Sequence, residues 1–155
     1  MVSNVQYSHT KGGGFVVTIL LVSHSKKITD GLKEMIEEMT GNQDDITIVS
    51  AGGTDDGRIG SDPINIKNEI EANSNSDSIF LFADIGSAVM SVETAIELLE
   101  DETLQEKCVY IDGPLVEGAF VASVQCMVNP ERESVIKEVT KLKSVLRLIR
   151  TWLKL

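Results

Sequence analysis

The stretch "FVVTILLVSHS", residues 15–25, decides the fold class of this chain. Residues 15–22 are apolar or β-branched throughout, a pattern typical of a strand that is buried on both faces. The run stops at His24, which lies between two serines, and Ser25 is a residue type that can cap a following helix. The stretch therefore predicts the first strand and helix of a βαβ unit, with His24 at their junction.

Strand-like and helix-like segments alternate along the rest of the chain. Apolar segments that predict strands lie at 15–23, 46–51, 78–84 and 108–112, and helices of about ten to fifteen residues are predicted between them. Such alternation is typical of parallel sheets built by right-handed crossovers. We therefore expect a single α/β domain with three layers: a mainly parallel sheet, in strand order 2-1-3-4, with helices on both faces.

The two ends of the chain differ from this regular middle part. Residues 1–14 are polar and lack periodicity, which predicts a disordered leader or an extension foreign to the native protein and sets His9 aside. Residues 15–129 form the predicted domain. Residues 130–155 predict a C-terminal amphipathic helix that packs on the domain, forms a dimer seam or contacts an acidic surface. Its apolar stripe has four-three spacing and consists of Val135, Val139, Leu142, Leu146, Ile149 and Leu153.

Charge and composition exclude several classes of protein. The formal net charge is −10, which opposes nucleic-acid phosphates and argues against a nucleic-acid partner. The charge is uneven, because residues 1–130 carry a net −14 and residues 131–155 a net +4. The sequence has neither a membrane-spanning apolar run nor a signal peptide, so we expect a cytoplasmic protein without membrane insertion. Cys108 and Cys126 lack metal-ligand spacing and predict buried thiols.

Polar side chains are predicted to converge where the strand order of the sheet reverses. In an open parallel sheet this point, outside the carboxyl ends of the strands, is where ligands bind. His24 and Asp84 end two adjacent predicted strands. A carboxylate can hold one ring N–H of a histidine and leave the other nitrogen free as a nucleophile or proton acceptor. We therefore expect Asp84 to present an oriented, neutral imidazole.

Two glycine-containing loops reach the same edge of the predicted sheet. The segments "AGGTDDGRIG" (51–60) and "DIGSA" (84–88) place small residues before a turn or helix, where backbone N–H groups and the helix dipole favour an anion such as phosphate. Neither loop matches a nucleotide-binding P-loop. The basic side chain in the first loop, Arg58, is predicted either to pair with phosphate or a partner's carboxylate, or to be a plain surface arginine.

Four motifs together carry a resemblance to a known family. They are "VSHS" at 22–25, "AGGTDDGRIGSDP" at 51–63, "DIGSAVM" at 84–90 and "GPLVEGA" at 113–119. In their order along the chain and in their spacing, these motifs resemble those of the phosphocarrier M subunits of bacterial phosphoenolpyruvate-dependent dihydroxyacetone kinases. The core of those subunits is similar to mannose-class IIA domains of the sugar phosphotransferase system. The resemblance covers about residues 16–128.

The resemblance implies a relay of phosphoryl groups. His24 would accept a phosphoryl group from the phosphohistidine of the general phosphocarrier protein HPr and pass it to ADP on an L subunit. The resulting ATP would phosphorylate dihydroxyacetone on a K subunit. Asp84 would orient the imidazole, and the pocket would be bounded by Gly52, Gly53, Thr54 and Ser87. The resemblance further implies a homodimer and no metal or cofactor on this chain, since ADP and Mg²⁺ belong to the L subunit.

Three alternatives remain open at this point. A mannose-class IIA component of a sugar transporter would use the same nucleophile with another acceptor, although "GGTDDGRIG" favours the kinase subunit. A receiver-like or anion-binding module would carry phosphate on Asp84 or bind an anion. A histidine phosphatase is less favoured, because arginine and glycine normally follow its nucleophile, whereas Ser25 and Lys26 follow His24.

Overall fold

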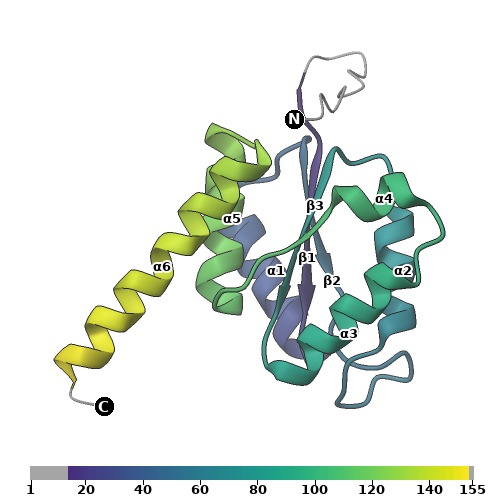
Figure 1. Cartoon of the computed structure of the whole chain (residues 1–155), viewed down its shortest axis with the longest axis horizontal. Coiled ribbons are helices and arrows are strands. Elements are labelled where there is room, and N and C mark those ends of the chain that lie inside the picture. Colours follow the sequence, from purple (N-terminus) through teal and green to yellow (C-terminus); the bar gives the residue numbers. More distant parts are fainter. Residues whose placement is uncertain (1–13, 154–155) are drawn as a thin grey trace.

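The computed structural model of the chain describes residues 14–153, so the predicted leader lies outside the described residues except for Gly14. Figure 1 shows a single α/β domain from which one helix extends. In chain order the elements are β1 (Val17–Val22), α1 (Lys26–Thr40), β2 (Ile46–Ser50), α2 (Pro63–Ala72), β3 (Ser78–Ala83), α3 (Gly86–Glu97), α4 (Glu102–Lys107), β4 (Cys108–Tyr110), α5 (Leu115–Val128) and α6 (Arg132–Trp152).

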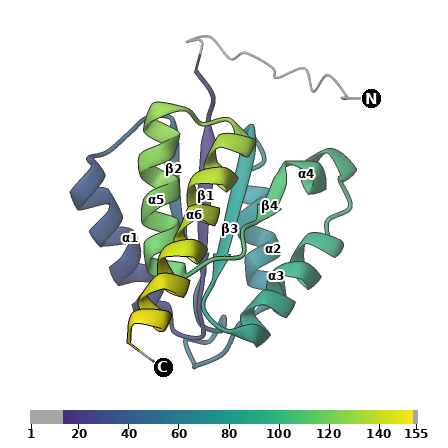
Figure 2. The ribbon, with the colours of Figure 1, turned by 60° about the vertical axis from the view of Figure 1, so that its left-hand side comes forward.

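The four strands form one parallel sheet in the order β2-β1-β3-β4, which confirms the predicted topology. Figure 2 shows α1, α5 and α6 on one face of the sheet and α2 and α3 on the other, so the three predicted layers are present. All six residues of β1 are buried, because β1 lies between two strands and beneath both helix layers.

The side chains of β1 alternate between two hydrophobic cores. Ile19 and Leu21 pack toward α1 and α5, whereas Leu20 and Val22 pack toward α2 and α3. Alternation arises because successive strand residues point to opposite faces of a sheet. Each fully buried side chain of this size contributes roughly 1.5–3 kcal/mol to folding. The apolar run of residues 15–22 thus fixes the strand end at which His24 lies.

The fourth strand is shorter than predicted, ending at Tyr110 rather than at residue 112. The Ile111 N–H still donates to the Leu81 carbonyl, but Pro114 follows and has no N–H to continue the ladder. The helix α4, which the sequence analysis did not predict, precedes this strand. Its N-cap is Asp101, whose carboxylate accepts hydrogen bonds from two backbone N–H groups of the first turn.

A side-chain cap explains the start of α2 but not that of α1. Pro63 is the first residue of α2, as predicted, and Asp62 caps that helix by accepting from the N–H groups of Ile64 and Asn65. Ser25 lies at the N-cap position of α1, but its side chain makes no capping hydrogen bond. The predicted position of Ser25 is therefore right, and its predicted side-chain role is wrong.

The cysteines are thiols in apolar surroundings. Cys126 is buried and Cys108 is half-buried. Burial raises the pKa of the Cys126 thiol to about 12 and that of the Cys108 thiol to about 11. Both thiols therefore stay protonated at neutral pH.

The last helix belongs to the domain only in its first half. Val135 and Val139 are buried against α5, and Leu142 is half-buried. The helix then runs away from the domain, and Ile149 and Leu153 of the same stripe are exposed. No helix between residues 14 and 153 has the length and apolar character needed to cross a membrane.

Candidate functional site

His24 and Asp84 meet at the carboxyl edge of the sheet, as predicted. Val22 of β1 is paired with Ala83 of β3, so the residues that follow these strand ends lie side by side. The Asp84 Oδ1 atom is 3.0 Å from His24 Nδ1, and Oδ2 accepts the His24 backbone N–H at 3.0 Å. One carboxylate thus holds both the ring and the backbone of the histidine.

Two further donors saturate this carboxylate. The Ser23 hydroxyl donates to Oδ2 at 2.9 Å, and the Ile85 N–H donates to Oδ1 at 2.7 Å. Burial alone would raise the pKa of Asp84, but the N–H groups of His24 and Ile85, the Ser23 hydroxyl and the His24 ring together hold it below its ordinary value. Asp84 is therefore ionised at neutral pH and acts only as an acceptor.

The ionised carboxylate determines the tautomer of a neutral His24. A carboxylate has no proton to give, so Nδ1 carries the ring proton and Nε2 carries the free lone pair. Nε2 lies 2.6 Å from the Ser87 hydroxyl, in the first turn of α3. The side chain of His24 is 23% exposed. The unprotonated nitrogen is thus on the accessible side, next to a hydroxyl and the N-terminus of a helix.

The glycine loop lies where the sequence analysis placed it, but its backbone N–H groups are used within the protein. The Gly52 N–H donates to the Thr29 hydroxyl at 3.1 Å, and the Gly53 N–H donates to the Ser23 carbonyl at 2.9 Å. The Thr54 N–H donates to the Arg58 carbonyl at 3.0 Å. These bonds fix the loop beside the His24 segment instead of leaving its amides as open donors for an anion.

Close packing explains the two glycines. A Cβ atom at Gly52 would lie 2.6 Å from the Ser25 carbonyl oxygen and would also collide with the Thr29 hydroxyl. Gly53 has a φ of 74°, a conformation that side chains disfavour. The loop can pack this closely against the start of α1 only with glycine at both positions.

Arg58 pairs with the loop rather than with the histidine. Its Nε atom is 2.6 Å from Asp56 Oδ2, and both side chains are exposed. The pKa of Asp56 is below its ordinary value, mainly because the Thr54 hydroxyl donates to its carboxylate and, to a smaller extent, because Arg58 does so. Within residues 14–153, the ion pair of Arg58 is thus with Asp56, in the same loop.

Two supporting residues were missed by the sequence analysis. Ser23 is buried, donates to Asp84 and accepts the Ser25 N–H at 3.1 Å. Thr29 is also buried, and its hydroxyl oxygen accepts from Gly52 and from the Ser50 hydroxyl. Ser23 could have been predicted as a supporting residue, because its hydroxyl comes directly before the histidine in the sequence. Nothing in the sequence indicates that Thr29 contacts Gly52.

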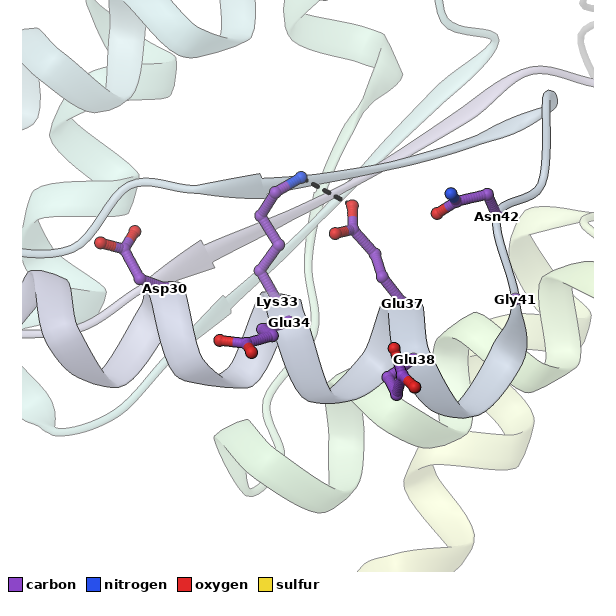
Figure 3. Close-up of a pocket in the computed structure, with 7 residues that line it drawn as sticks. All are labelled: Asp30, Lys33, Glu34, Glu37, Glu38, Gly41 and Asn42. Carbon is purple, nitrogen blue, oxygen red and sulfur yellow. Dashed lines mark hydrogen bonds and ion pairs between the residues drawn. The ribbon is translucent and has the colours of Figure 1, made fainter.

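A hollow of the described surface lies along another part of the molecule. It is an open depression of about 580 Å³ along α1, and Figure 3 shows Lys33 paired with Glu37 at its wall. Acidic side chains predominate in it, and His24 does not line it. This depression is therefore separate from the His24 site.

Comparisons with known proteins identify the family of this chain. The family model EIIA-man, described as the fructose IIA component of the phosphotransferase system, matches residues 18–136. A relative from Listeria innocua, the phosphoryl donor subunit DhaM of PEP-dependent dihydroxyacetone kinase 2, is 53% identical over 127 residues, covering 82% of this chain and 99% of the relative. DhaM of Lactococcus lactis is 32% identical, covering 80% of this chain and 94% of the relative.

Longer relatives and a solved structure match as well. The phosphoryl donor subunit DhaM of Escherichia coli K12 is 34% identical, and the match covers 78% of this chain but 26% of that protein. The crystal structure of EF1359, a protein of unknown function, superimposes with a TM-score of 0.75 at 46% identity and covers 82% of this chain and 95% of that one. The chain therefore belongs to the EIIA-man family of the phosphotransferase system, together with the DhaM phosphoryl donor subunits.

Proposed function

We propose that this chain is a phosphohistidine carrier that serves a dihydroxyacetone kinase. His24 takes a phosphoryl group from the phosphohistidine of HPr and passes it to ADP bound to an L subunit, where the ATP formed phosphorylates dihydroxyacetone on the K subunit. The observation that supports this proposal most directly is the hydrogen bond of His24 Nδ1 to Asp84, which leaves the Nε2 lone pair available.

Nε2 is the nucleophile in this proposal. The Nε2–P bond forms while the N–P bond of the donor phosphohistidine breaks, and the donor imidazole leaves with the electron pair. Because Nδ1 keeps its proton, the phosphorylated ring of His24 carries a positive charge, which the carboxylate of Asp84 stabilises. A cationic ring is also a good leaving group, so the same charge supports transfer onward to ADP.

Ser87 and the first turn of α3 would bind the phosphoryl group. The hydroxyl that donates to Nε2 at 2.6 Å can donate to a phosphoryl oxygen once the nitrogen is occupied. The helix N-terminus adds backbone N–H groups and a favourable dipole. Gly52, Gly53 and Thr54 would shape the pocket rather than bind phosphate directly, and Arg58 would meet a docking partner at the rim. The relay needs no metal or cofactor on this chain.

The names of the relatives favour the kinase subunit over a IIA component of a sugar transporter. The similar proteins from Listeria innocua and Lactococcus lactis are both named as subunits of dihydroxyacetone kinases. Since the chemistry at His24 would be the same in both cases, the acceptor decides between them. A relay between PEP and ADP also places the chain in the cytoplasm.

Phosphoryl transfer tests the proposal. The chain is incubated with PEP, enzyme I and HPr and analysed by intact mass spectrometry, and the L subunit with ADP is then added. We expect one phosphoryl group, labile in acid and stable in alkali, that is lost to ADP. His24→Ala abolishes the label while the circular dichroism spectrum is unchanged. The matched control His9→Ala, which changes the other histidine, labels normally.

Two results would reject parts of the proposal. An alkali-labile label that disappears in Asp84→Asn and persists in His24→Ala identifies an acyl phosphate and a receiver-like function. A label on His24 that does not pass to ADP on the L subunit identifies a carrier with another acceptor, such as a sugar transporter.

A further inference from the structure

The outer half of α6, residues 143–152, carries an apolar face that is open to solvent. The face is formed by Val145, Leu148, Ile149 and Trp152, whose spacing of three, one and three residues is typical of one apolar side of a helix. Leu148 is 68% exposed and Trp152 is 88% exposed. A continuous apolar face of this kind marks an interaction site.

This face does not point toward the domain from which the helix extends. The inner half of α6 contacts the domain through Val135, Val139 and Leu142. At 3.6 residues per turn, the centre of the outer apolar face lies roughly a quarter of a turn around the helix from these three residues. Figure 1 shows α6 running away from the sheet toward the C-terminus. The surface that covers the outer face therefore has to come from outside this domain.

The polar side of the outer half is basic. Lys143, Arg147 and Arg150 recur at spacings of four and three residues and share that side, and residues 139–155 contain no acidic residue. Lys143 pairs with Asp112 of the domain at 2.7 Å. In the described part of the chain, neither Arg147 nor Arg150 forms an ion pair. Two uncompensated guanidinium groups thus lie on the side of the helix opposite to an apolar face.

An apolar side and a basic opposite side are typical of a helix that lies at a lipid surface. On a protein partner, charges on the far side of the helix would meet nothing. On an anionic bilayer, the helix lies at the boundary between acyl chains and head groups, so that lipid phosphates surround it and long basic side chains bend toward them. Tryptophan favours the same boundary, because its ring is apolar and its N–H is polar.

We propose that the outer half of α6 binds to the surface of an anionic lipid bilayer. The face around Leu148 and Trp152 enters the outer edge of the acyl layer, and Arg147 and Arg150 pair with head-group phosphates. The helix lies along the surface without crossing the bilayer. This contact is independent of the phosphoryl chemistry proposed for His24.

The acidic domain opposes this contact only weakly. Residues 1–130 carry a net charge of −14, which an anionic bilayer repels. Repulsion between exposed charges is screened beyond about 8 Å at physiological ionic strength, whereas the outer half of α6 extends about 15 Å from the domain. Because the domain packs a quarter of a turn away from the apolar face, it lies beside the helix and not between the helix and the lipid.

Trp152 reports on this contact directly, because it is the single tryptophan of the chain. The full chain is titrated with vesicles that mix phosphatidylglycerol and phosphatidylcholine, and Trp152 emission, acrylamide quenching and flotation with the vesicles are measured. We expect a blue shift, weaker quenching and co-flotation, with an affinity roughly tenfold or more above that for vesicles of phosphatidylcholine alone. Glycerol phosphate, which offers a head-group phosphate without an apolar layer, should leave the emission unchanged.

One pair of variants tests the apolar face. Leu148→Ser should weaken binding to the mixed vesicles roughly tenfold, because the side chain leaves water only when the lipid is bound. Met39→Ser is the matched control, since Met39 is 64% exposed on α1, close to the 68% of Leu148. This control should bind like the unchanged chain.

A second pair tests the basic side. Arg147→Gln with Arg150→Gln should weaken binding to the mixed vesicles roughly tenfold or more and reduce its dependence on salt. Lys27→Gln with Lys137→Gln removes the same charge from two exposed positions outside the outer half of α6, and should leave the affinity close to that of the unchanged chain.

Four results would overturn the inference. A Trp152 emission that mixed vesicles leave unchanged shows that lipid does not cover this face. An emission that is blue-shifted and shielded from acrylamide before lipid is added assigns the face to a protein contact, such as a second copy. Equal affinity for both kinds of vesicle removes anionic lipid as the partner. Binding that survives Leu148→Ser and Arg147→Gln/Arg150→Gln places the lipid contact elsewhere on the molecule.

Discussion

At the scale of single residues, one carboxylate holds the candidate site together by accepting from four donors. Asp84 accepts from the ring and backbone of His24, from Ser23 and from Ile85. The first two contacts position His24, the proposed nucleophile, and the other two keep the carboxylate itself in place. Loss of this side chain therefore affects both stability and transfer.

The lowered pKa of Asp84 predicts an acid-dependent contribution to stability. A carboxyl whose pKa is lower in the folded than in the unfolded state stabilises the fold above its ordinary value, near pH 4, and loses that contribution as the pH falls through its folded pKa. We expect Asp84→Asn to lower the free energy of unfolding at pH 7 and to have a smaller effect at pH 3. Urea denaturation at both pH values measures this, and an equal loss at both would contradict it.

Ser87 is predicted to assist transfer without being essential. Its hydroxyl lies 2.6 Å from His24 Nε2 and is proposed to donate to the phosphoryl group as the new bond forms, and a hydrogen bond of this kind is worth about 1–1.5 kcal/mol. Ser87→Ala should therefore slow phosphorylation of His24 about tenfold, measured by rapid-quench labelling from HPr, while the final extent of labelling is unchanged. Thr94→Ala, which removes an exposed hydroxyl from the same helix, is the matched control. Complete loss of labelling would assign Ser87 a larger role.

At the scale of elements, the glycine loop and α1 act as one unit. The loop after β2 is fastened to α1 through Thr29 and to the end of β1 through Ser23. The Gly60 N–H also donates to the His24 carbonyl at 2.8 Å. The position of the histidine backbone thus depends on a loop that is distant in sequence.

Two glycine substitutions should have opposite effects on stability. Gly52→Ala places a Cβ against the Ser25 carbonyl and the Thr29 hydroxyl, and should destabilise the fold by roughly 1–3 kcal/mol. Gly31→Ala lies within α1, where a Cβ would meet nothing within 4 Å, and should stabilise it by about 0.4–1 kcal/mol. Urea unfolding of both variants checks the prediction. Similar effects of the same sign would contradict the packing at Gly52.

At the scale of the whole molecule, α6 divides into a structural half and a protruding half. The first half closes one core through Val135 and Val139, and the second half leaves the domain. The His24 site lies at the carboxyl edge of the sheet and draws no contact from α6 in the described residues. Folding and phosphoryl chemistry should therefore be separable from the end of this helix.

Removal of residues 143–155 tests this separation. Because the buried residues of α6 are retained, we expect the thermal midpoint at low protein concentration and the rate of His24 phosphorylation to stay close to those of the full chain. Differential scanning calorimetry and HPr-dependent labelling measure these. A further cut that also removes Val135 and Val139 should lower the midpoint strongly, by loss of core packing.

The order of the four strands, the parallel sheet and the meeting of His24 with Asp84 could all be predicted from the sequence. These follow from local patterns: the buried run of residues 15–22 shows a central strand, and polar residues that end neighbouring parallel strands must share an edge. The length of β4 and the helix α4 escaped the same reasoning, because a short edge strand and a single capped turn leave little periodic signal.

The contacts between particular atoms of the candidate site became clear only from the tertiary structure. It set His24 Nδ1 against the Asp84 carboxylate, occupied the amides of Gly52 and Gly53 with partners inside the protein, and turned Arg58 toward Asp56. It also ended the packing of α6 near Leu142, although the apolar stripe continues. Hydrogen-bond direction and the extent of a contact depend on side chains from distant parts of the chain, and no local pattern encodes where those side chains meet.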